Sequence, residues 1–408
     1  MVNDFYKTAR AGLPHAKRIG AFFVAPLVAM LFVVSVVYAC TPFFHVVPPR
    51  AFAGSSWYNP YANLPTAPGR WQLANFHAHS RVWGGLTSGN QSADSVVAAY
   101  RKLHYDVIGV SNYSTSPRSR VEGTFPVYEH GLNIFKAHQL VLGTDHVTWL
   151  DYPFWQSRNQ QQNILTKLRS NAALVAIAHP RVRNAYTPDD LRYLSDYDLL
   201  EVLNRYSLPA EDEWDAALSS GHPVWLLADD DSHNVTDSEV TGINATEVYA
   251  RTPDTQDIID ALRAGRAYGV HTENGQMPLQ LQSLQMRGDT VSVAVSGAVT
   301  DLRIVGEDGT VRARATGTAA RGGRLSVVAA QGDGYLRVVA QGDSTMLLTN
   351  PVIRWDGREL ARVEPIVDWP RTIRWRIFWV LAYGSLGWRF VGLRRRRLAR
   401  RADARSRG

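Results

Sequence analysis

The sequence predicts an α/β barrel-like domain over residues 71–270, followed by a smaller all-β sandwich-like domain over residues 271–368. In the first region, short apolar runs alternate with segments of helical pattern, which is typical of a mostly parallel sheet or barrel. In the second region, apolar and polar residues alternate between glycine turns, as in LQLQSLQM and TVSVAVSG. A chain of 408 residues is long enough for both.

The N-terminus predicts a membrane anchor. Residues 1–19 are basic, and residues 20–40 form an uncharged apolar run long enough to cross a hydrocarbon core of roughly 30 Å. Two alternatives stay open, a signal peptide cleaved after Ala39 and a lipoprotein signal that would present Cys40 for lipidation. Each of the three carries the body of the protein out of the cytoplasm.

The C-terminal region 371–408 combines an apolar run at residues 377–393 with an arginine-rich tail. The run is either an amphipathic helix on anionic membrane lipid or a second membrane span. The positive-inside rule places both basic ends in the cytoplasm and the body on the extracytoplasmic, periplasmic side of the cytoplasmic membrane.

Charge and cysteine content exclude several classes of protein. The formal charge is +7, but residues 1–20 carry +3 and residues 371–408 carry +11, which leaves about −7 for the body. A body of this charge predicts no specific nucleic-acid partner. The single cysteine, Cys40, excludes both an intrachain disulfide framework and a Cys-rich zinc module. Residues 41–70, rich in Pro, Gly and Ser, predict a linker, with folded structure from about Trp71.

Histidine and aspartate close three of the predicted strands. His77 and His79 follow the first strand on one face, His179 ends the apolar run of residues 173–178, and Asp231 and His233 follow the run of residues 223–228. Carboxyl ends of barrel strands gather on one face, and nitrogen and oxygen ligands suit Zn, Mn or Fe. The spacing therefore predicts a site for divalent metal ions.

These motifs resemble the polymerase and histidinol phosphatase (PHP) family, in which HxH, HP and DxH end an early, a middle and a late strand. The resemblance covers about residues 71–270 and implies a distorted (β/α)7 barrel with phosphoesterase activity. It places Asp145, after Gly143, where the family has a glutamate that bridges metals. Ser88 and Tyr113 stand where the family has further ligands, so the resemblance implies one or two metals here, not three.

Other nearby residues are candidates to complete a rearranged site. Possible extra ligands are Glu129, His130, His138 and His146. Arg181 and Arg183, two and four residues after His179, have the guanidinium geometry that binds phosphate oxygens bidentately, and Arg181 is the candidate for a catalytic role. Glu201 and Asn204 end a strand at the same rim, where they resemble residues that orient the ligands.

The predicted function is hydrolysis of a phosphomonoester or phosphodiester by metal-activated water, with Asp231 and Arg181 in catalytic roles. The expected substrate is a phosphorylated small molecule or an envelope phosphoester. Two alternatives stay open: a degenerate, non-catalytic binding module, and a metal-dependent hydrolase of a non-phosphate bond. The sequence contains no Gly-x-Ser-x-Gly motif for a serine hydrolase and no Walker A loop.

Overall fold

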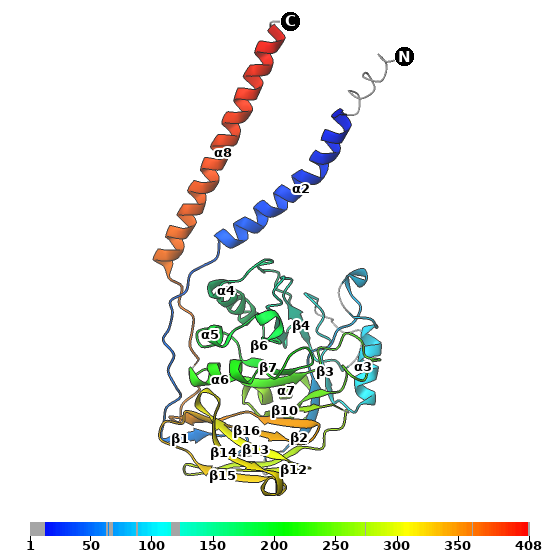
Figure 1. Cartoon of the computed structure of the whole chain (residues 1–408), viewed down its shortest axis with the longest axis vertical. Coiled ribbons are helices and arrows are strands. Elements are labelled where there is room, and N and C mark those ends of the chain that lie inside the picture. Colours follow the sequence, from blue (N-terminus) through cyan, green and yellow to red (C-terminus); the bar gives the residue numbers. More distant parts are fainter. Residues whose placement is uncertain are drawn as a thin grey trace. The chain divides into compact units, whose positions relative to one another are not determined.

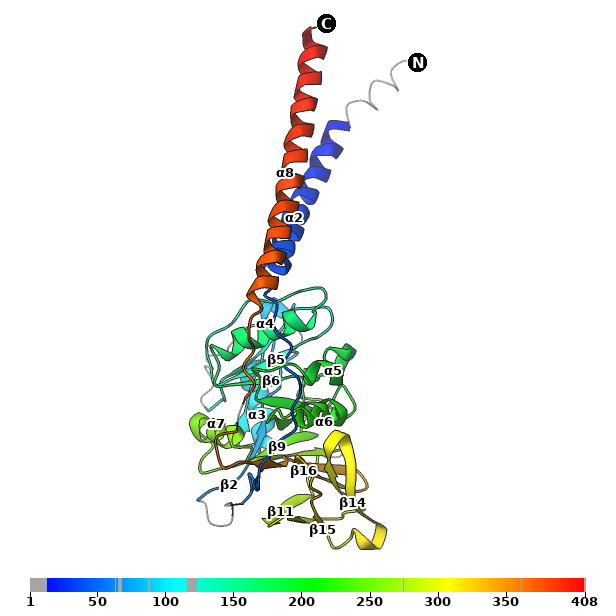
Figure 2. The ribbon, with the colours of Figure 1, turned by 90° about the vertical axis from the view of Figure 1, so that its left-hand side faces the viewer.

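The computed structural model of the chain describes residues 13–62, 64, 68–86, 89–115, 123–273, 275–360 and 362–406. It divides into two compact units, residues 46–365 and the paired terminal segments 1–45 and 366–408. Figures 1 and 2 show the ribbon in two views. The larger unit carries the predicted metal site.

The terminal unit contains two helices, α2 (Leu13–Ala39) and α8 (Trp369–Ser406). They are tied together by a β-bridge between Phe44 and Val367 and by a hydrogen bond from the Tyr383 hydroxyl to Ser35 Oγ of 3.0 Å. Over the residues that the structure describes, neither helix is both long and apolar enough for a membrane span. The predicted anchor at 20–40 and second span at 377–393 stay predictions, and residues 1–12 lie outside the described residues.

A five-stranded sheet with the order β4-β5-β6-β7-β8 forms the central part of the larger unit. Its strands are β4 (Val127–His130), β5 (Gln139–Leu142), β6 (Leu174–Ile177), β7 (Leu199–Asn204) and β8 (Trp225–Asp229). All their residues are buried, as expected for short Val- and Leu-rich strands covered on both faces. β6, β7 and β8 are parallel, whereas β5 is antiparallel to both of its neighbours. The helices that follow β5, β6 and β7 are α4 (Arg158–Arg169), α5 (Pro188–Leu191) and α6 (Glu211–Ser219).

A ten-stranded sheet has the order β1-β18-β16-β17-β10-β9-β2-β3, with β13 beside β16 and β14 beside β13. Its strands are β1 (Ser56–Tyr58), β2 (Arg70–Asn75), β3 (Val107–Ile108), β9 (Asn244–Ala250), β10 (Ala267–Thr272), β13 (Asp301–Gly306), β14 (Thr310–Thr316), β16 (Tyr335–Gln341), β17 (Thr345–Thr349) and β18 (Val352–Trp355). A three-stranded sheet consists of β11 (Gln280–Arg287), β12 (Thr290–Ser296) and β15 (Arg324–Val328). Helices α3 (Ala93–Lys102) and α7 (Thr255–Arg263) complete the unit, and the predicted mixed α/β class is confirmed.

The ten-stranded sheet runs across the boundary predicted at residue 270. β10 pairs with β9 on one side and with β17 on the other, so strands from both predicted domains share one hydrogen-bonded sheet. Residues 46–365 accordingly form one compact unit. Figure 1 shows β14 and β15 at one end of this unit and α4 at the other.

The segment predicted as a linker is corrected by the structure, because folding begins before Trp71. β1 pairs with β18, and the buried Tyr61 donates a hydrogen bond of 2.6 Å to the carbonyl of Ala267. The Arg354 guanidinium lies 4.1 Å from the centre of the Trp57 ring. Three aromatic residues within five positions supply the apolar surface that fixes an otherwise irregular arm.

Isolated β-bridges connect the sheets around the site. Gly109 pairs with Phe125 and Tyr113 with Glu129, which places the chain after β3 beside β4. Ala78 pairs with Ser232, which places the chain after β2 beside the chain after β8. The strands β2 to β8 therefore follow one another around a common centre, and the predicted strand-end histidines and aspartate meet there.

Candidate metal centre

His77 and His79 follow directly after β2 and are fully buried. The alternation of the extended chain turns both rings to the same side, and their Nε2 atoms lie 3.3 Å apart. These two imidazole nitrogens face carboxylates, and they supply two of the four ligand atoms of a first metal-binding group.

The first ligand group adds one oxygen from each of two carboxylates. Asp231 Oδ1 lies 3.2 Å from Nε2 of His77 and 3.1 Å from Nε2 of His79. Glu129 Oε2 lies 3.5 Å and 3.2 Å from the same two nitrogens. Metal–ligand bonds of about 2.0–2.2 Å separate neighbouring ligand atoms by roughly 3 to 3.5 Å, so these four atoms suit a single ion.

A second ligand group lies on the other side of Glu129. The Oε1 atom of Glu129 is 2.5 Å from Nδ1 of His138 and 3.2 Å from Nε2 of His179. Asp231 Oδ2 is 4.0 Å from the same His179 nitrogen. The carboxylate of Glu129 thus faces both groups, as a ligand that bridges two metals does.

His233 adjoins this arrangement at its outer edge. It is partly buried, its ring lies 4.4 Å from that of His79, and its Nδ1 is 2.7 Å from the carbonyl of Asp231 and 3.6 Å from Oδ1. His79, Asp231 and His233 form a further group whose atoms could share an ion.

Glu201, on β7, supports the ligands from behind. Its Oε1 lies 3.0 Å from Nδ1 of His77, and its Oε2 accepts a hydrogen bond of 2.6 Å from the backbone N–H of His179. A carboxylate in this position fixes the tautomer and orientation of a ligating imidazole.

The electrostatics of the cluster keep its carboxylates ionised. Burial raises the pKa of Asp231, but the imidazoles of His77, His79 and His179 outweigh it and hold that pKa below its usual range. Burial also raises the pKa of Glu129, but the neighbouring imidazoles reverse this effect and hold that pKa well below its ordinary value. Burial lowers the pKa of His77, yet the surrounding carboxylates raise it well above normal. Divalent cations would replace the protons on these imidazoles.

Two further observations show that these residues fit metal ions. The buried Oε2 of Glu129 has no hydrogen-bond partner, although two ring nitrogens face it. Buried carboxylate oxygens are rarely left unsatisfied, and a bound cation satisfies such an oxygen in place of a hydrogen bond. His179 and Asp231 both hold positive φ angles, 26° and 52°, and such backbone strain gathers at ligand-binding positions.

Among the described residues, neither Asp145, which the family resemblance implied, nor His146, a candidate extra ligand, belongs to a group that could share an ion, which corrects both predictions. Because β5 runs antiparallel to β4, its start lies near Glu129 and its end lies at the opposite edge of the sheet. Both residues follow that far end and lie outside the buried interior. His138, which directly precedes β5, lies at the site instead, and Glu129 lies between the two ligand groups.

His130 was a candidate metal ligand and Arg181 a candidate phosphate-binding side chain, but both have other partners in the structure. His130 is buried, but its ring nitrogens lie 2.7 Å from Gln139 Oε1 and 2.9 Å from the carbonyl of Leu150, outside the ligand groups. Arg181 pairs with Glu213 and Asp212 at the start of α6, with distances of 2.7 Å to each. Neither residue lines the cavity of the centre.

A cavity of about 360 Å³ opens onto the ligands and is lined by two cationic side chains, Arg183 and Lys136, of which sequence reasoning missed Lys136. It is lined by Tyr113, Lys136, His138, His179, Val182, Arg183, Tyr206, Asp231 and His233. Lys136 and Arg183 supply the positive charge that was predicted for Arg181. Arg183 is one of the two arginines after His179 whose guanidinium groups were predicted to suit phosphate oxygens.

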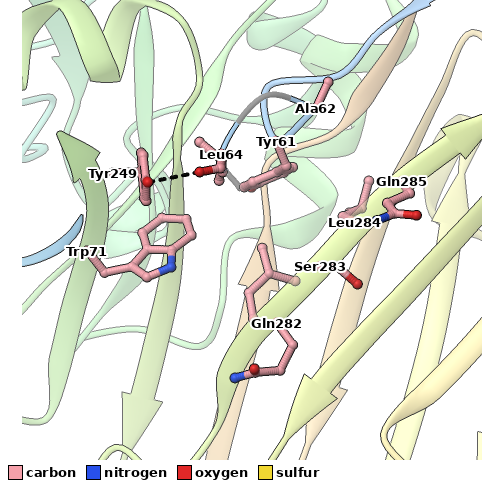
Figure 3. Close-up of a pocket in the computed structure, with 10 residues that line it drawn as sticks. Tyr61, Ala62, Leu64, Trp71, Tyr249, Gln282, Ser283, Leu284 and Gln285 are labelled. Carbon is pink, nitrogen blue, oxygen red and sulfur yellow. Dashed lines mark hydrogen bonds between the residues drawn. The ribbon is translucent and has the colours of Figure 1, made fainter. Parts of the chain in front are cut away.

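A second cavity, of about 230 Å³, lies between Tyr61, Ala62 and Leu64 of the arm, Trp71, Tyr249 and β11 (Figure 3). The Tyr249 hydroxyl donates a hydrogen bond of 2.9 Å to the carbonyl of Leu64 across it. None of the residues described as lining it is a His, Asp or Glu. It therefore has no constellation for metal chemistry.

Tyr113, which stands where the PHP family has a further ligand, and its neighbour Asn112 have structural roles here. Asn112 accepts from the backbone N–H of Ser80 and donates to its hydroxyl, both at 2.8 Å. The ring of Tyr113 stacks on His79 with centroids 4.8 Å apart. Ser88, the other departure, lies outside the described residues.

No protein-family profile matches the chain, and no curated protein matches it. Among solved structures, it is similar to a two-domain protein from Bacteroides vulgatus containing a predicted PHP-like metal-dependent phosphoesterase, with 13% identity, 76% of this chain and 92% of that chain covered, and a TM-score of 0.38. It is also similar to PsfC from Pseudomonas syringae PB-5123, with 13% identity and a TM-score of 0.34. That match covers 48% of this chain and 90% of PsfC. TM-scores this low carry no argument, so the proposed function rests on the geometry of the site.

Proposed function

We propose that the chain is a metal-dependent hydrolase of phosphoesters. The observation that carries the proposal is the position of Glu129, whose two oxygens face two separate groups of buried ligands. Two adjacent divalent metal ions lower the pKa of a bound water and stabilise the attacking and leaving oxygens of a phosphoryl transfer. His77, His79, Glu129 and Asp231 would hold the first ion, and Glu129, His138 and His179 the second.

The cations of the cavity favour a phosphoester over a carboxylic ester or amide. Lys136 and Arg183 line the same cavity as His179 and Asp231. Fixed positive charges near the reacting centre stabilise the negative charge that develops on phosphoryl oxygens. A hydrolase of a neutral amide or ester has no need of two such side chains.

Asp231 is the chain's candidate for positioning the reacting water, since it belongs to the first ligand group and also lines the cavity. The buried imidazoles hold its pKa low, so it stays an acceptor near neutral pH. A carboxylate with one oxygen toward a metal keeps the other free to accept a hydrogen bond.

The strands β2 to β8 correspond, in this proposal, to the distorted seven-stranded barrel implied by the family resemblance. The bridges of Ala78 with Ser232 and of Tyr113 with Glu129 support it. A shared core of buried residues from β11, β12, β13, β16 and β17 supports a sandwich-like all-β part. Display outside the cytoplasmic membrane is proposed from the basic termini and the apolar run of residues 20–40 alone.

The test is metal content by mass spectrometry on the purified full chain, together with a phosphomonoesterase and phosphodiesterase assay. We expect two metals per chain, metal-dependent turnover, and loss of both in a His77→Ala, His79→Ala double variant. One metal or none, with no turnover after addition of Mn or Zn, would favour the non-catalytic binding module.

A further inference from the structure

Large apolar side chains are exposed on the loops around the cavity of the metal centre. Six of them, which we call the apolar rim, have between 45% and 75% of their surface exposed: Trp83, Ile134, Phe135, Trp149, Tyr206 and Leu208. They come from separate stretches of the chain. Single exposed apolar residues elsewhere on the unit, such as Val311 and Val328, are ordinary, but a group around one opening marks a binding surface.

Contacts place these side chains next to the cavity. Tyr206 lines it, with its ring 5.7 Å from that of His233. The indole N–H of Trp83 donates a hydrogen bond of 3.0 Å to the carbonyl of Tyr113, another lining residue. The ring of Trp149 lies 6.1 Å from that of Trp83.

The remaining rim residues belong to the same loops as lining residues. Ile134 and Phe135 directly precede Lys136, and the Arg183 guanidinium donates to the carbonyl of Ile134. Leu208 follows Tyr206 by two positions. Polarity therefore changes from ionised ligands at the floor, through Lys136 and Arg183 in the wall, to an apolar rim.

We propose that the substrate is a lipid phosphoester, in which a phosphate group is joined to a long hydrocarbon chain. The inference rests on the proposed phosphoesterase function and names its substrate class. A phosphate at the floor meets the cations, while a hydrocarbon chain that leaves the cavity crosses the rim, so one amphiphile satisfies both surfaces. Trp and Tyr in the rim suit the boundary between lipid headgroups and acyl chains.

The experiment compares butyl phosphate with dodecyl phosphate, and their methyl diesters, as substrates of the metal-loaded full chain. Release of the alcohol is measured by mass spectrometry. We measure kinetics and not binding to lipid vesicles, because the exposed apolar side chains of α2 and α8 would bind vesicles even without a contribution from the apolar rim. We expect kcat/KM to rise at least about tenfold from butyl to dodecyl, as hydrophobic contacts of a few methylenes allow.

Two matched double variants assign that rise to the rim. Ile134→Ala with Leu208→Ala removes two exposed aliphatic side chains from the rim, and Val311→Ala with Val328→Ala removes two from elsewhere. The dodecyl-to-butyl ratio should fall about tenfold in the first and stay unchanged in the second. Equal turnover of both chain lengths, or a ratio that survives the rim variant, overturns the lipid assignment alone and favours a protein partner for the rim. Absence of turnover with every ester overturns the phosphoesterase proposal as well.

Discussion

The carboxylate of Glu201 lies 3.0 Å from Nδ1 of His77, whereas Nε2 of the same ring faces Glu129 and Asp231. Because a neutral imidazole carries its proton on one nitrogen, a proton held at Nδ1 by Glu201 leaves the Nε2 lone pair free for a metal. The second oxygen of Glu201 accepts from the His179 N–H, so one side chain orients ligands of both groups.

Replacing Glu201 should therefore weaken metal binding without removing a ligand. We expect Glu201→Gln to lower metal affinity by roughly 10- to 100-fold, the usual effect of losing a partner of a ligating histidine. Titration of the metal-free chain with Zn or Mn measures it. Glu247→Gln on β9 is the control, since Glu247 is also largely buried but belongs to no ligand group. Equal affinities in the two variants would show that Glu201 does not orient the ligands.

Glu129 and Asp145 compete for the role of bridging carboxylate, and their variants separate the two assignments. Glu129→Ala should reduce the metal content from two ions per chain and lower activity by more than the roughly 10- to 100-fold typical of residues that only orient ligands. Asp145→Ala should leave both unchanged, because Asp145 follows the far end of β5. The reverse pattern would return the bridge to Asp145.

This pair also shows which parts of the site local sequence patterns can predict. His77, His79, His179 and Asp231 each end a strand that the apolar pattern reveals, and the structure brings all four together. The sequence predicts Glu129 and His138 only as candidates for extra ligands, because their positions relative to the site depend on the direction of β5. That direction is set by pairing with β4 and β6, and an apolar run of four residues reads the same in both directions.

Long-range pairing explains the differences in the fold as well. The α/β region and the β-rich region were predicted from their periodicity, but nothing local shows that β17 pairs with β10 across residue 270. The arm containing Tyr61 is predicted as a linker from its Pro, Gly and Ser content. That composition does not show that a few aromatic side chains fix the arm through distant contacts, such as the hydrogen bond from Tyr61 to Ala267. The choice between Arg181 and Arg183 depended on α6, whose Asp212 and Glu213 engage Arg181.

Arg183 and Arg181 give a further prediction about activity. Arg183→Ala should reduce kcat/KM for a phosphoester by roughly 10- to 100-fold, since a lost hydrogen bond to a charged group is worth about 1.5–3 kcal/mol. Arg181→Ala should affect thermal stability more than turnover. Steady-state kinetics and thermal unfolding of both variants measure this. A larger kinetic loss in Arg181→Ala would restore its predicted catalytic role.

The buried ion pair between Arg337 and Asp215 connects β16 to α6, and so the two predicted domains. Both guanidinium bonds to Asp215 are short, at 2.8 Å and 2.6 Å, and Arg337 is 1% exposed. Arg337→Met would leave a buried carboxylate unpaired, which typically costs about 3–5 kcal/mol. We expect this loss in urea unfolding of the full chain, whereas the exposed Arg314→Met should change the midpoint little. Similar midpoints for both variants would contradict a structural coupling through Arg337.

Glu247 predicts how stability depends on pH away from the metal centre. Burial, reinforced by Asp106 and opposed by Arg70, raises the pKa of its carboxyl to about 7. Between the ordinary value of 4.5 and about 7, the folded protein holds a proton that the unfolded chain has released, so stability falls as pH rises through this range. Each pKa unit by which the folded and unfolded states differ changes the free energy of unfolding by about 1.4 kcal/mol.

Glu247→Gln removes this titration, so the variant should match the wild type at pH 4.5 and become more stable than it, by up to a few kcal/mol, above pH 7. Urea unfolding of both proteins at several pH values, with a chelator present, gives the difference. Contributions from the histidines of the metal centre cancel in that difference, because both proteins contain them. Glu239→Gln, at an exposed position, serves as the control. A gap between variant and wild type that is constant with pH would show that Glu247 does not keep its proton in the folded protein.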